Sequence, residues 1–142
     1  MGSMERRALL QATLAWISAG HVLTGLALLS GRRGIRAGSA IYGAEFVPTE
    51  QFEAIIRPAA VYVLAMAYLQ AQAAREPERH RAVIDGTLGL FGARLLQRTL
   101  FARQVQQTFG IAPARHWATT IYFALLTGLL LAARAQFERE AA

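Results

Sequence analysis

Three long apolar runs constrain this chain more than any other feature, because they suit a lipid bilayer better than water. The first, Ala8 to Ser30, carries no charge, and the others extend from Ala59 to Ala74 and from His116 to Ala133. A helix needs about 20 apolar residues to cross the roughly 30 Å of membrane hydrocarbon. We therefore expect each run to form the main part of a transmembrane helix.

A fourth segment, Val83 to Val105, has the length of a membrane span but contains charged residues. Asp85 lies near its start, and Arg94 and Arg98 lie well inside it. An arginine that faces lipid near the bilayer centre costs about 3 kcal/mol or more. We therefore expect the three apolar helices to surround this segment and to shelter its arginines.

The long connection after the first run has the composition of a loop. Residues 31–53 contain four glycines and Pro48, which favour turns over regular structure. Thr49 then predicts the N-cap of a second helix that begins around Glu50. Pro58 predicts either a kink in this helix or a break after a short interfacial segment.

The remaining boundaries are short. Residues 75–81 form a charged turn, Gly110 is suited to end the third helix, and Pro113 is suited to begin the fourth. Because short turns join antiparallel neighbours, the predicted fold is all-α: four transmembrane helices run up, down, up and down, with both termini on the same side. Residues 4–142 form a single integral membrane domain, and residues 1–3 look like a cloning remnant.

The charge balance indicates a membrane surface as the partner. The net charge is +6, all 15 basic residues are arginine, and cysteine is absent. The arginines lie mostly between the apolar runs, which favours anionic lipid headgroups, and no soluble module is present to bind nucleic acid. The absence of cysteine excludes disulfides and thiolate chemistry. The positive-inside rule leans slightly toward cytoplasmic termini, so we expect a multi-pass protein of the inner (plasma) membrane.

Helix geometry places several polar side chains at a similar depth. At 1.5 Å per residue, His21, Arg94 and Arg98 lie roughly 16–22 Å from the side of the termini. Tyr62 and Tyr122, on the two helices that run back, lie about 12 Å below the opposite side. The sequence therefore predicts a polar layer inside the bundle, displaced toward the long connection.

This layer needs carboxylates, and the three apolar runs contain none. Asp85 is about 13 Å and half a helix rotation from Arg94, which leaves the glutamates of residues 31–53. We expect this connection to fold into the mouth of the bundle, where Glu50 or Glu53 pairs with Arg94 or Arg98. The predicted ligand-binding residues are His21, Glu50, Glu53, Tyr62, Arg94, Arg98 and Tyr122.

Structural roles are alternatives for the same residues. A buried Arg–Glu pair can join helices, Arg98 can extend to the interface, His21 can be a packing residue, and the glycines of the third span can serve close helix contact. The motifs of phosphate loops, dinucleotide-binding folds and zinc proteases are missing, and the three histidines are scattered. We therefore predict neither a metal site nor a cofactor.

The four-span plan also carries a family resemblance. Arg57-Pro58 through Tyr62, the turn Arg75-Glu76-Pro77 and an arginine after Gly92 resemble the DoxX-like small four-helix membrane proteins of bacteria. The resemblance covers most of the chain, from residue 8 to residue 134. The founding member of that family is described as a subunit of a thiosulfate:quinone oxidoreductase. The resemblance therefore implies an accessory membrane subunit or a binder of quinone-like or lipid ligands.

Two functional hypotheses follow. In the first, the protein is an accessory or binding subunit whose polar intramembrane pocket holds a quinone- or lipid-like ligand, or a helix of a membrane protein partner. Arg94 and Arg98 would then bind an anionic or carbonyl head. In the second, it is a membrane-embedded enzyme in which His21 or Glu53 acts as acid or base on a lipophilic substrate. A soluble or peripheral helical bundle is a third interpretation, because the third span is so polar.

Overall fold

The computed structural model describes residues 3–141, apart from the side chains of residues 3, 6, 136 and 138–141. Within this part the chain is helical and contains no strand, so the all-α prediction is confirmed. Met1 and Gly2 of the predicted cloning remnant lie outside the described residues. The helices are α1 (Ser3–Leu29), α2 (Arg32–Ile41), α3 (Glu50–Arg75), α4 (Arg81–Leu100), α5 (Ala102–Phe109) and α6 (Pro113–Ala141).

Three helices are long and apolar enough to cross a membrane. They are Arg7–Leu29 of α1, all of α3, and Pro113–Ala135 of α6. The chain therefore has the helices of a multi-pass membrane protein. α4 has 20 residues, which make about 30 Å of helix, but its charged residues make it more polar than the other three.

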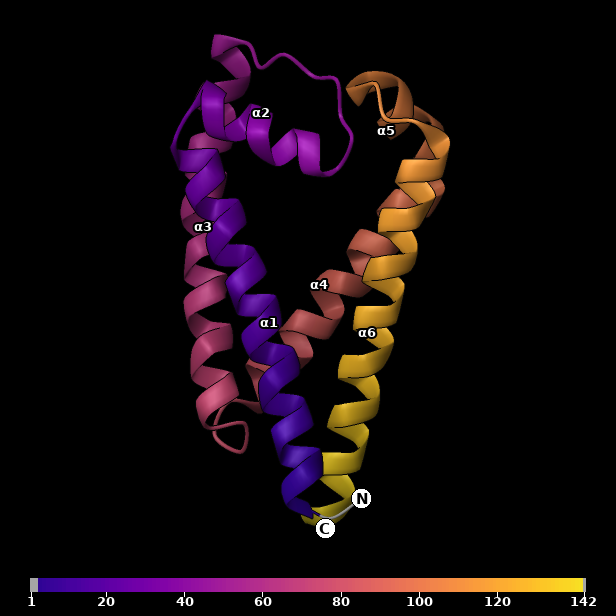
Figure 1. Ribbon diagram of the computed structural model, residues 1–142. Helices are drawn as coiled ribbons and strands as arrows, with labels where there is room; N and C mark the ends of the chain where they lie inside the picture. Colours follow the sequence, from indigo (N-terminus) through magenta and orange to yellow (C-terminus); the bar gives the residue numbers. More distant parts are fainter. Residues whose placement is uncertain (1–2, 142) are drawn as a thin grey trace.

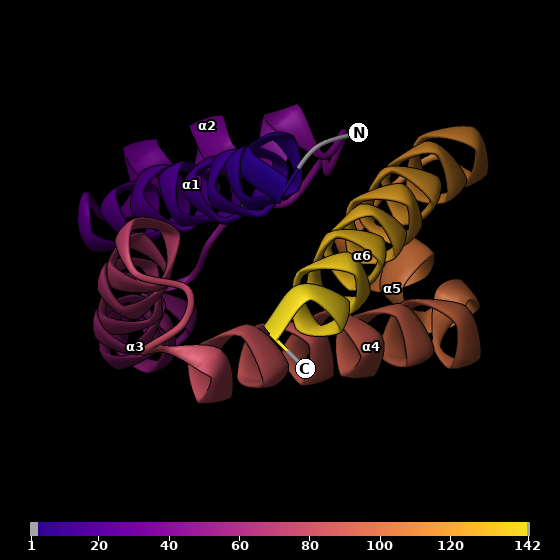
Figure 2. The same ribbon diagram turned by 90° about the horizontal axis from the view of Figure 1, so that it is seen from below.

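The four long helices alternate in direction and form two pairs (Figure 1). α1 lies along α3, and α4 runs obliquely from the turn after α3 and packs against α6. The pairs meet where α1 contacts α6 and α3 contacts α4, and they diverge toward α2 and α5, as both views show (Figures 1 and 2). α1 begins and α6 ends at the same end of the molecule, which we call the terminal end; α2 and α5 mark the opposite, loop end.

The main apolar core lies toward the terminal end. Leu10, Leu14 and Ile17 share one face of α1. They pack against side chains from the other three long helices, namely Ala73, Ile84, Phe91, Leu130, Ala133 and Phe137. This cluster joins the two helix pairs.

Several predicted boundaries are confirmed. The Thr49 hydroxyl accepts a hydrogen bond from the amide of Phe52 at 3.2 Å, so Thr49 caps α3. Gly110 ends α5 with a φ of 62°, a conformation that glycine adopts at little cost. Pro113 begins α6, and the turn after Arg75 joins α3 to α4.

The long connection differs from the predicted loop because part of it forms α2. Arg32, Arg33 and Arg36 are exposed on this helix, whereas Ile35 is buried. A helix with a charged outer face and an apolar inner side is amphipathic. α2 therefore covers the loop end of the bundle beside α1.

Two other boundaries also differ. α3 continues through Pro58, so of the two alternatives predicted there the break after a short interfacial segment is wrong. The predicted single helix from Val83 to Val105 is also wrong, because α4 ends at Leu100 and α5 begins at Ala102. The hydroxyl of Thr99, in the last turn of α4, donates to a backbone carbonyl four residues earlier at 3.0 Å. Such side-chain bonds compete with the backbone bonds of a helix.

Candidate functional site

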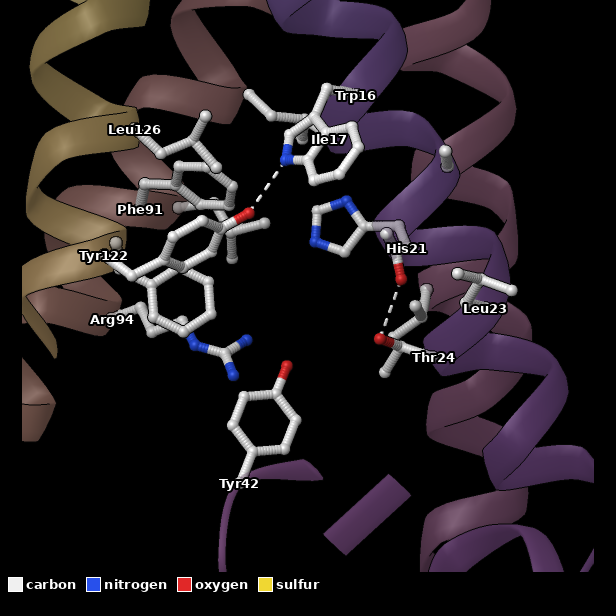
Figure 3. A pocket seen from close by; sticks show the side chains of 15 residues that line it. Trp16, Ile17, His21, Leu23, Thr24, Tyr42, Phe91, Arg94, Tyr122 and Leu126 are labelled. Atoms are coloured by element: carbon white, nitrogen blue, oxygen red, sulfur yellow. Dashed lines mark hydrogen bonds between the residues drawn. The ribbon is translucent and has the colours of Figure 1, made fainter. Parts of the chain in front are cut away.

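A cavity of about 290 Å³ lies between the two helix pairs (Figure 3). Its lining comes from α1, α3, α4 and α6, together with Tyr42 directly after α2. Most of the lining is apolar. The side chains with polar atoms are Trp16, His21, Thr24, Tyr42, Arg94 and Tyr122. An apolar cavity with a few convergent polar groups is the usual form of a small-molecule site.

The cavity brings together three of the predicted ligand-binding residues. His21, Arg94 and Tyr122 line it, and Figure 3 shows their side chains around the same space. They come from α1, α4 and α6, so the rise per residue correctly placed residues of three helices at one level. Ligand binding by these residues stays a prediction.

A chain of hydrogen bonds through the buried side chains of Gln70 and Thr87 fixes the ring of His21. Its Nδ1 lies 2.7 Å from Gln70 Oε1, and Gln70 Nε2 donates to Thr87 Oγ1 at 3.1 Å. The Thr87 hydroxyl in turn donates to the carbonyl of Val83. Because Gln70 Oε1 can only accept, Nδ1 of His21 is the donor in this bond. The tautomer with its proton on Nδ1 has an acceptor at Nε2. Figure 3 shows the other side of the ring facing the cavity.

Arg94 enters the cavity from α4, and no acidic side chain of the described residues pairs with it. Its guanidinium lies over the ring of Phe123, 4.5 Å from the ring centroid, which is a cation–π contact. Figure 3 shows the Tyr42 hydroxyl directed toward it. A guanidinium has five N–H donors, so this part of the cavity presents donors and positive charge.

Trp16 and Tyr122 join α1 to α6 beside the cavity. Trp16 Nε1 donates to the Tyr122 hydroxyl oxygen at 2.8 Å (Figure 3). Because Tyr122 is the acceptor in this bond, its own proton remains available to a ligand. Both residues are also largely exposed, although they line the cavity.

Arg98 lies outside the cavity lining and connects α4 to α6. It is 7% exposed, and its guanidinium donates to the Thr120 hydroxyl at 3.0 Å and to the carbonyl of His116 at 3.1 Å. His116 Nε2 lies 3.0 Å from the carbonyl of Arg98. This arrangement satisfies the arginine within the bundle. It differs from both predicted roles, a ligand contact and an extension to the interface.

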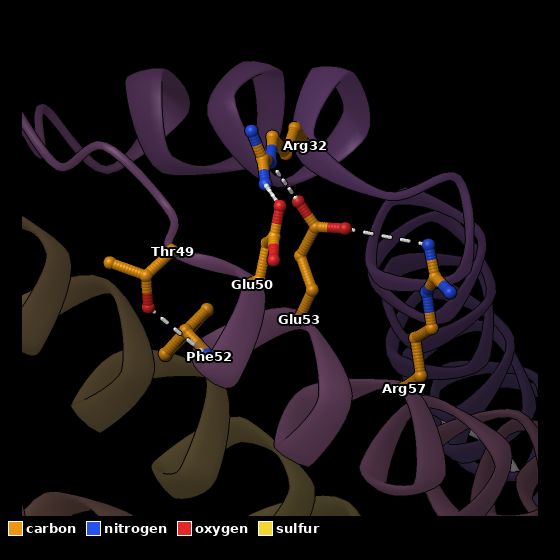
Figure 4. A network of polar contacts seen from close by, with 6 residues as sticks. All are labelled: Arg32, Thr49, Glu50, Phe52, Glu53 and Arg57. Carbon is orange, nitrogen blue, oxygen red and sulfur yellow. Dashed lines mark hydrogen bonds and ion pairs between the residues drawn. The ribbon is translucent and has the colours of Figure 1, made fainter.

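Glu50 and Glu53 pair with arginines of the loop end and not with those of α4, so the predicted pairing is wrong (Figure 4). Glu53 lies between Arg32 and Arg57, and Glu50 lies 3.2 Å from Arg32. The hydrogen bond that Arg32 donates to Glu53, together with the negative charge of Glu53, raises the pKa of Arg32. Arg32 belongs to α2, the helix that was not expected, and it places a cation closer to these glutamates than α4 does.

Glu53→Gln tests this assignment. We expect the melting temperature in detergent to fall by no more than about 4 °C, because ion pairs with half-exposed arginines contribute little. Binding in the cavity should not change, since Glu53 does not line it. Glu50→Gln is the matched control, because its side chain is 91% exposed, and it should leave the melting temperature unchanged. Loss of ligand binding in the Glu53 variant would contradict the assignment.

Tyr62 points away from the cavity. It is 77% exposed, and its neighbour Val63 lines the cavity in its place. This stretch of α3 is apolar on all sides, so the sequence indicates the depth of a residue but not its rotation about the helix axis. Sequence reasoning also missed Tyr42 and Gln70. Gln70 could have been found, because an amide at such depth in a membrane helix needs a partner.

Asp85 and the glycines of α4 are not among the residues that line the cavity. Asp85 pairs with Arg134 of α6 at 2.6 Å. A side-chain carbon added at Gly86, Gly89 or Gly92 would meet no atom within 4 Å. Within the described part of the chain these glycines therefore do not mediate close helix packing, in contrast to the role proposed for them.

The described residues contain no group of three His, Cys, Asp or Glu side chains that could hold a metal ion. No family model, curated protein or solved structure matches the chain. The function is therefore inferred from the cavity and its polar side chains.

Proposed function

We propose that this protein is a small integral membrane protein of the inner membrane whose cavity binds a lipophilic ligand with a polar head, quinone-like or lipid-like. In this proposal α4 crosses the bilayer as the fourth span. The positions of its charged side chains support this. Asp85 forms an ion pair with α6, Arg98 donates hydrogen bonds to α6, and Arg94 lines the cavity. Arg94 and Arg98 therefore need not face lipid, where a charge is costly, and the half-exposed Asp85 lies in the first turns of α4, near the end of the span.

The observation that carries the proposal is the guanidinium of Arg94. It lies in a mostly apolar cavity and has no carboxylate partner among the described residues. An ionised group away from water is costly unless another group pairs with it. An anionic or carbonyl oxygen of a ligand would form a charge-assisted hydrogen bond with it. His21, Tyr42 and Tyr122 surround the same space and offer further hydrogen bonds.

The size of the cavity suits a head group better than a whole lipid. Its volume of about 290 Å³ lies just below the range of small-molecule sites, which span about 300–1,000 Å³. Trp16 and Leu23 line the cavity and are also exposed on the outer surface. A ligand tail can therefore pass between them into the surrounding lipid while the head stays at Arg94.

Arg94→Gln is expected to weaken ligand binding by about 10–100-fold, because a hydrogen bond to a charged group contributes about 1.5–3 kcal/mol. The measurement is native mass spectrometry of protein extracted with its native lipid, in which wild-type protein should carry a small-molecule adduct. Arg103→Gln is the matched control, since Arg103 is exposed on α5 and does not line the cavity. It should retain the adduct.

Two results would contradict the proposal. If wild-type protein carries no adduct and binds no lipophilic probe, the cavity has no such ligand. Equal adducts on both variants, with a lower melting temperature only for Arg94→Gln, would assign Arg94 to stability.

The resemblance to DoxX-like proteins supports an accessory-subunit role, in which a membrane protein partner delivers the ligand to the cavity or receives it. The slight excess of arginines at the terminal end supports cytoplasmic termini. Co-purification from native membranes tests the partner, and a C-terminal reporter active only in the cytoplasm tests the orientation.

A further inference from the structure

We infer that the ligand of this cavity carries a hydroxyl beside an oxyanion: the oxyanion binds Arg94, and the hydroxyl donates to His21 Nε2. The inference rests on the proposed function and specifies the head group. Two sources share this chemistry, a lipophilic 2-hydroxycarboxylate and a singly protonated phosphate monoester.

The oxyanion follows from the donors that line the cavity. The Arg94 guanidinium is positive, and among the described residues it makes a cation–π contact with the Phe123 ring but no ion pair with a carboxylate. The hydroxyl of Tyr42 points toward the same place, and Tyr122 keeps its proton free because it accepts from Trp16. Three donor side chains, one of them charged, match an oxygen-rich anion better than a neutral carbonyl.

The hydroxyl follows from the buried chain behind His21. To place the His21 proton on Nε2, the Gln70 amide would have to turn its NH₂ group toward Nδ1. Its oxygen would then face Thr87, whose hydroxyl would have to leave the carbonyl of Val83. Gln70 and Thr87 are fully buried, so no water replaces the hydrogen bond that the Val83 carbonyl would lose. Nε2 therefore stays an acceptor, and a ligand without a donor would leave it unpaired.

His21 and Arg94 lie on opposite helix pairs, one on α1 and the other on α4. A head group that bonds to both joins the pairs at the level of the cavity. Binding of such a ligand should raise the melting temperature, because the ligand stabilises only the assembled bundle.

The test combines four probes with two variants, in protein reconstituted into lipid nanodiscs. The probes are palmitate, 2-hydroxypalmitate and the methyl esters of both, and affinities come from titrations followed by the melting temperature. In wild-type protein the hydroxyl should increase affinity about tenfold, and methylation of the carboxylate should decrease it about 10–100-fold. In His21→Phe, which keeps an aromatic ring beside Phe91, the hydroxyl effect should vanish while the carboxylate effect remains. In Arg94→Gln the carboxylate effect should vanish while the hydroxyl effect remains.

Gln70 is a positioning residue in this inference, and it has its own readout. Gln70→Met should abolish the hydroxyl effect and give a mixture of His21 tautomers in ¹⁵N spectra. Gln70→Glu should restore both, because a protonated carboxyl can accept from His21 and donate to Thr87. A general loss of packing would not be repaired by this substitution.

The outcomes separate the two levels of the argument. If none of the probes binds, and hexadecyl phosphate does not bind either, the head-group inference is overturned. The proposed function, which also allows a quinone-like head, fails if protein extracted with its native lipid carries no adduct as well. If the probes bind but the hydroxyl effect is the same in wild type and His21→Phe, the head-group inference is overturned and the proposed function stands. If the affinity for hexadecyl phosphate, and for no other probe, is lower in His21→Phe than in wild type, the inference is supported and the ligand is a phosphate monoester.

Discussion

Gly34→Ala is expected to lower the free energy of unfolding by about 3 kcal/mol, because α2 packs too closely on the end of α1 to admit a methyl group. A β-carbon at Gly34 would overlap the Ser30 hydroxyl and the carbonyl oxygen of Ala27. The Ser30 side chain can rotate, but the carbonyl belongs to the backbone of α1 and cannot move alone. Urea unfolding followed by circular dichroism in detergent measures the loss.

Gly38→Ala is the matched control on the same helix. Its β-carbon would lie 3.7 Å from that of Ala27, an ordinary contact, and alanine is favoured over glycine in a helix by about 0.5–1 kcal/mol. This variant should therefore be slightly more stable than the wild type. Gly34→Ala should also weaken ligand binding, because α2 leads directly to Tyr42. Equal stability of the two variants would show that α2 does not pack on α1 in this way.

Leu130→Ala is expected to cost up to about 2 kcal/mol of stability. Leu130 is fully buried in the core that joins the two helix pairs. In lipid, little transfer energy drives helices together, so most of the loss comes from the empty volume left by the deleted atoms, at about 24 cal/mol per Å³. The same unfolding measurement detects it.

Leu125→Ala provides the comparison within α6. Leu125 is 69% exposed, so its truncation should change stability by less than about 0.5 kcal/mol. A larger effect at Leu125 than at Leu130 would mean that α6 packs in the bundle through its other face.

The spans that lipid imposes were predictable, and the elements at the loop end were not. α1, α3 and α6 contain the apolar runs that membrane helices require. α2 was hidden by its glycines, which are typical of loops in sequence. The structure gives Gly34 another role, since its missing side chain permits the approach of α2 to α1. A single sequence does not distinguish a glycine that permits close helix contact from a glycine that permits a turn.

The site was predictable in depth but not in rotation or charge pairing. A fixed rise per residue brought His21, Arg94 and Tyr122 to one level. No comparable rule fixes rotation on an apolar helix, so Tyr62 was placed in the cavity although Val63 lines it. The glutamates were misassigned because their pairing depends on which cation lies nearest, and that cation, Arg32, is on a helix that the sequence did not reveal.

The position of the core has a consequence for amide hydrogen exchange. The cluster around Leu14 and Leu130 holds the helices together toward the terminal end, whereas the pairs diverge toward the loop end. Regions with fewer packed contacts open at lower free energy. Amides in the first half of α1 and the second half of α6 should therefore exchange slowly, and those beside the cavity faster. A ligand that bridges His21 and Arg94 would slow the faster set selectively, so exchange would report occupancy of the cavity without knowledge of the ligand.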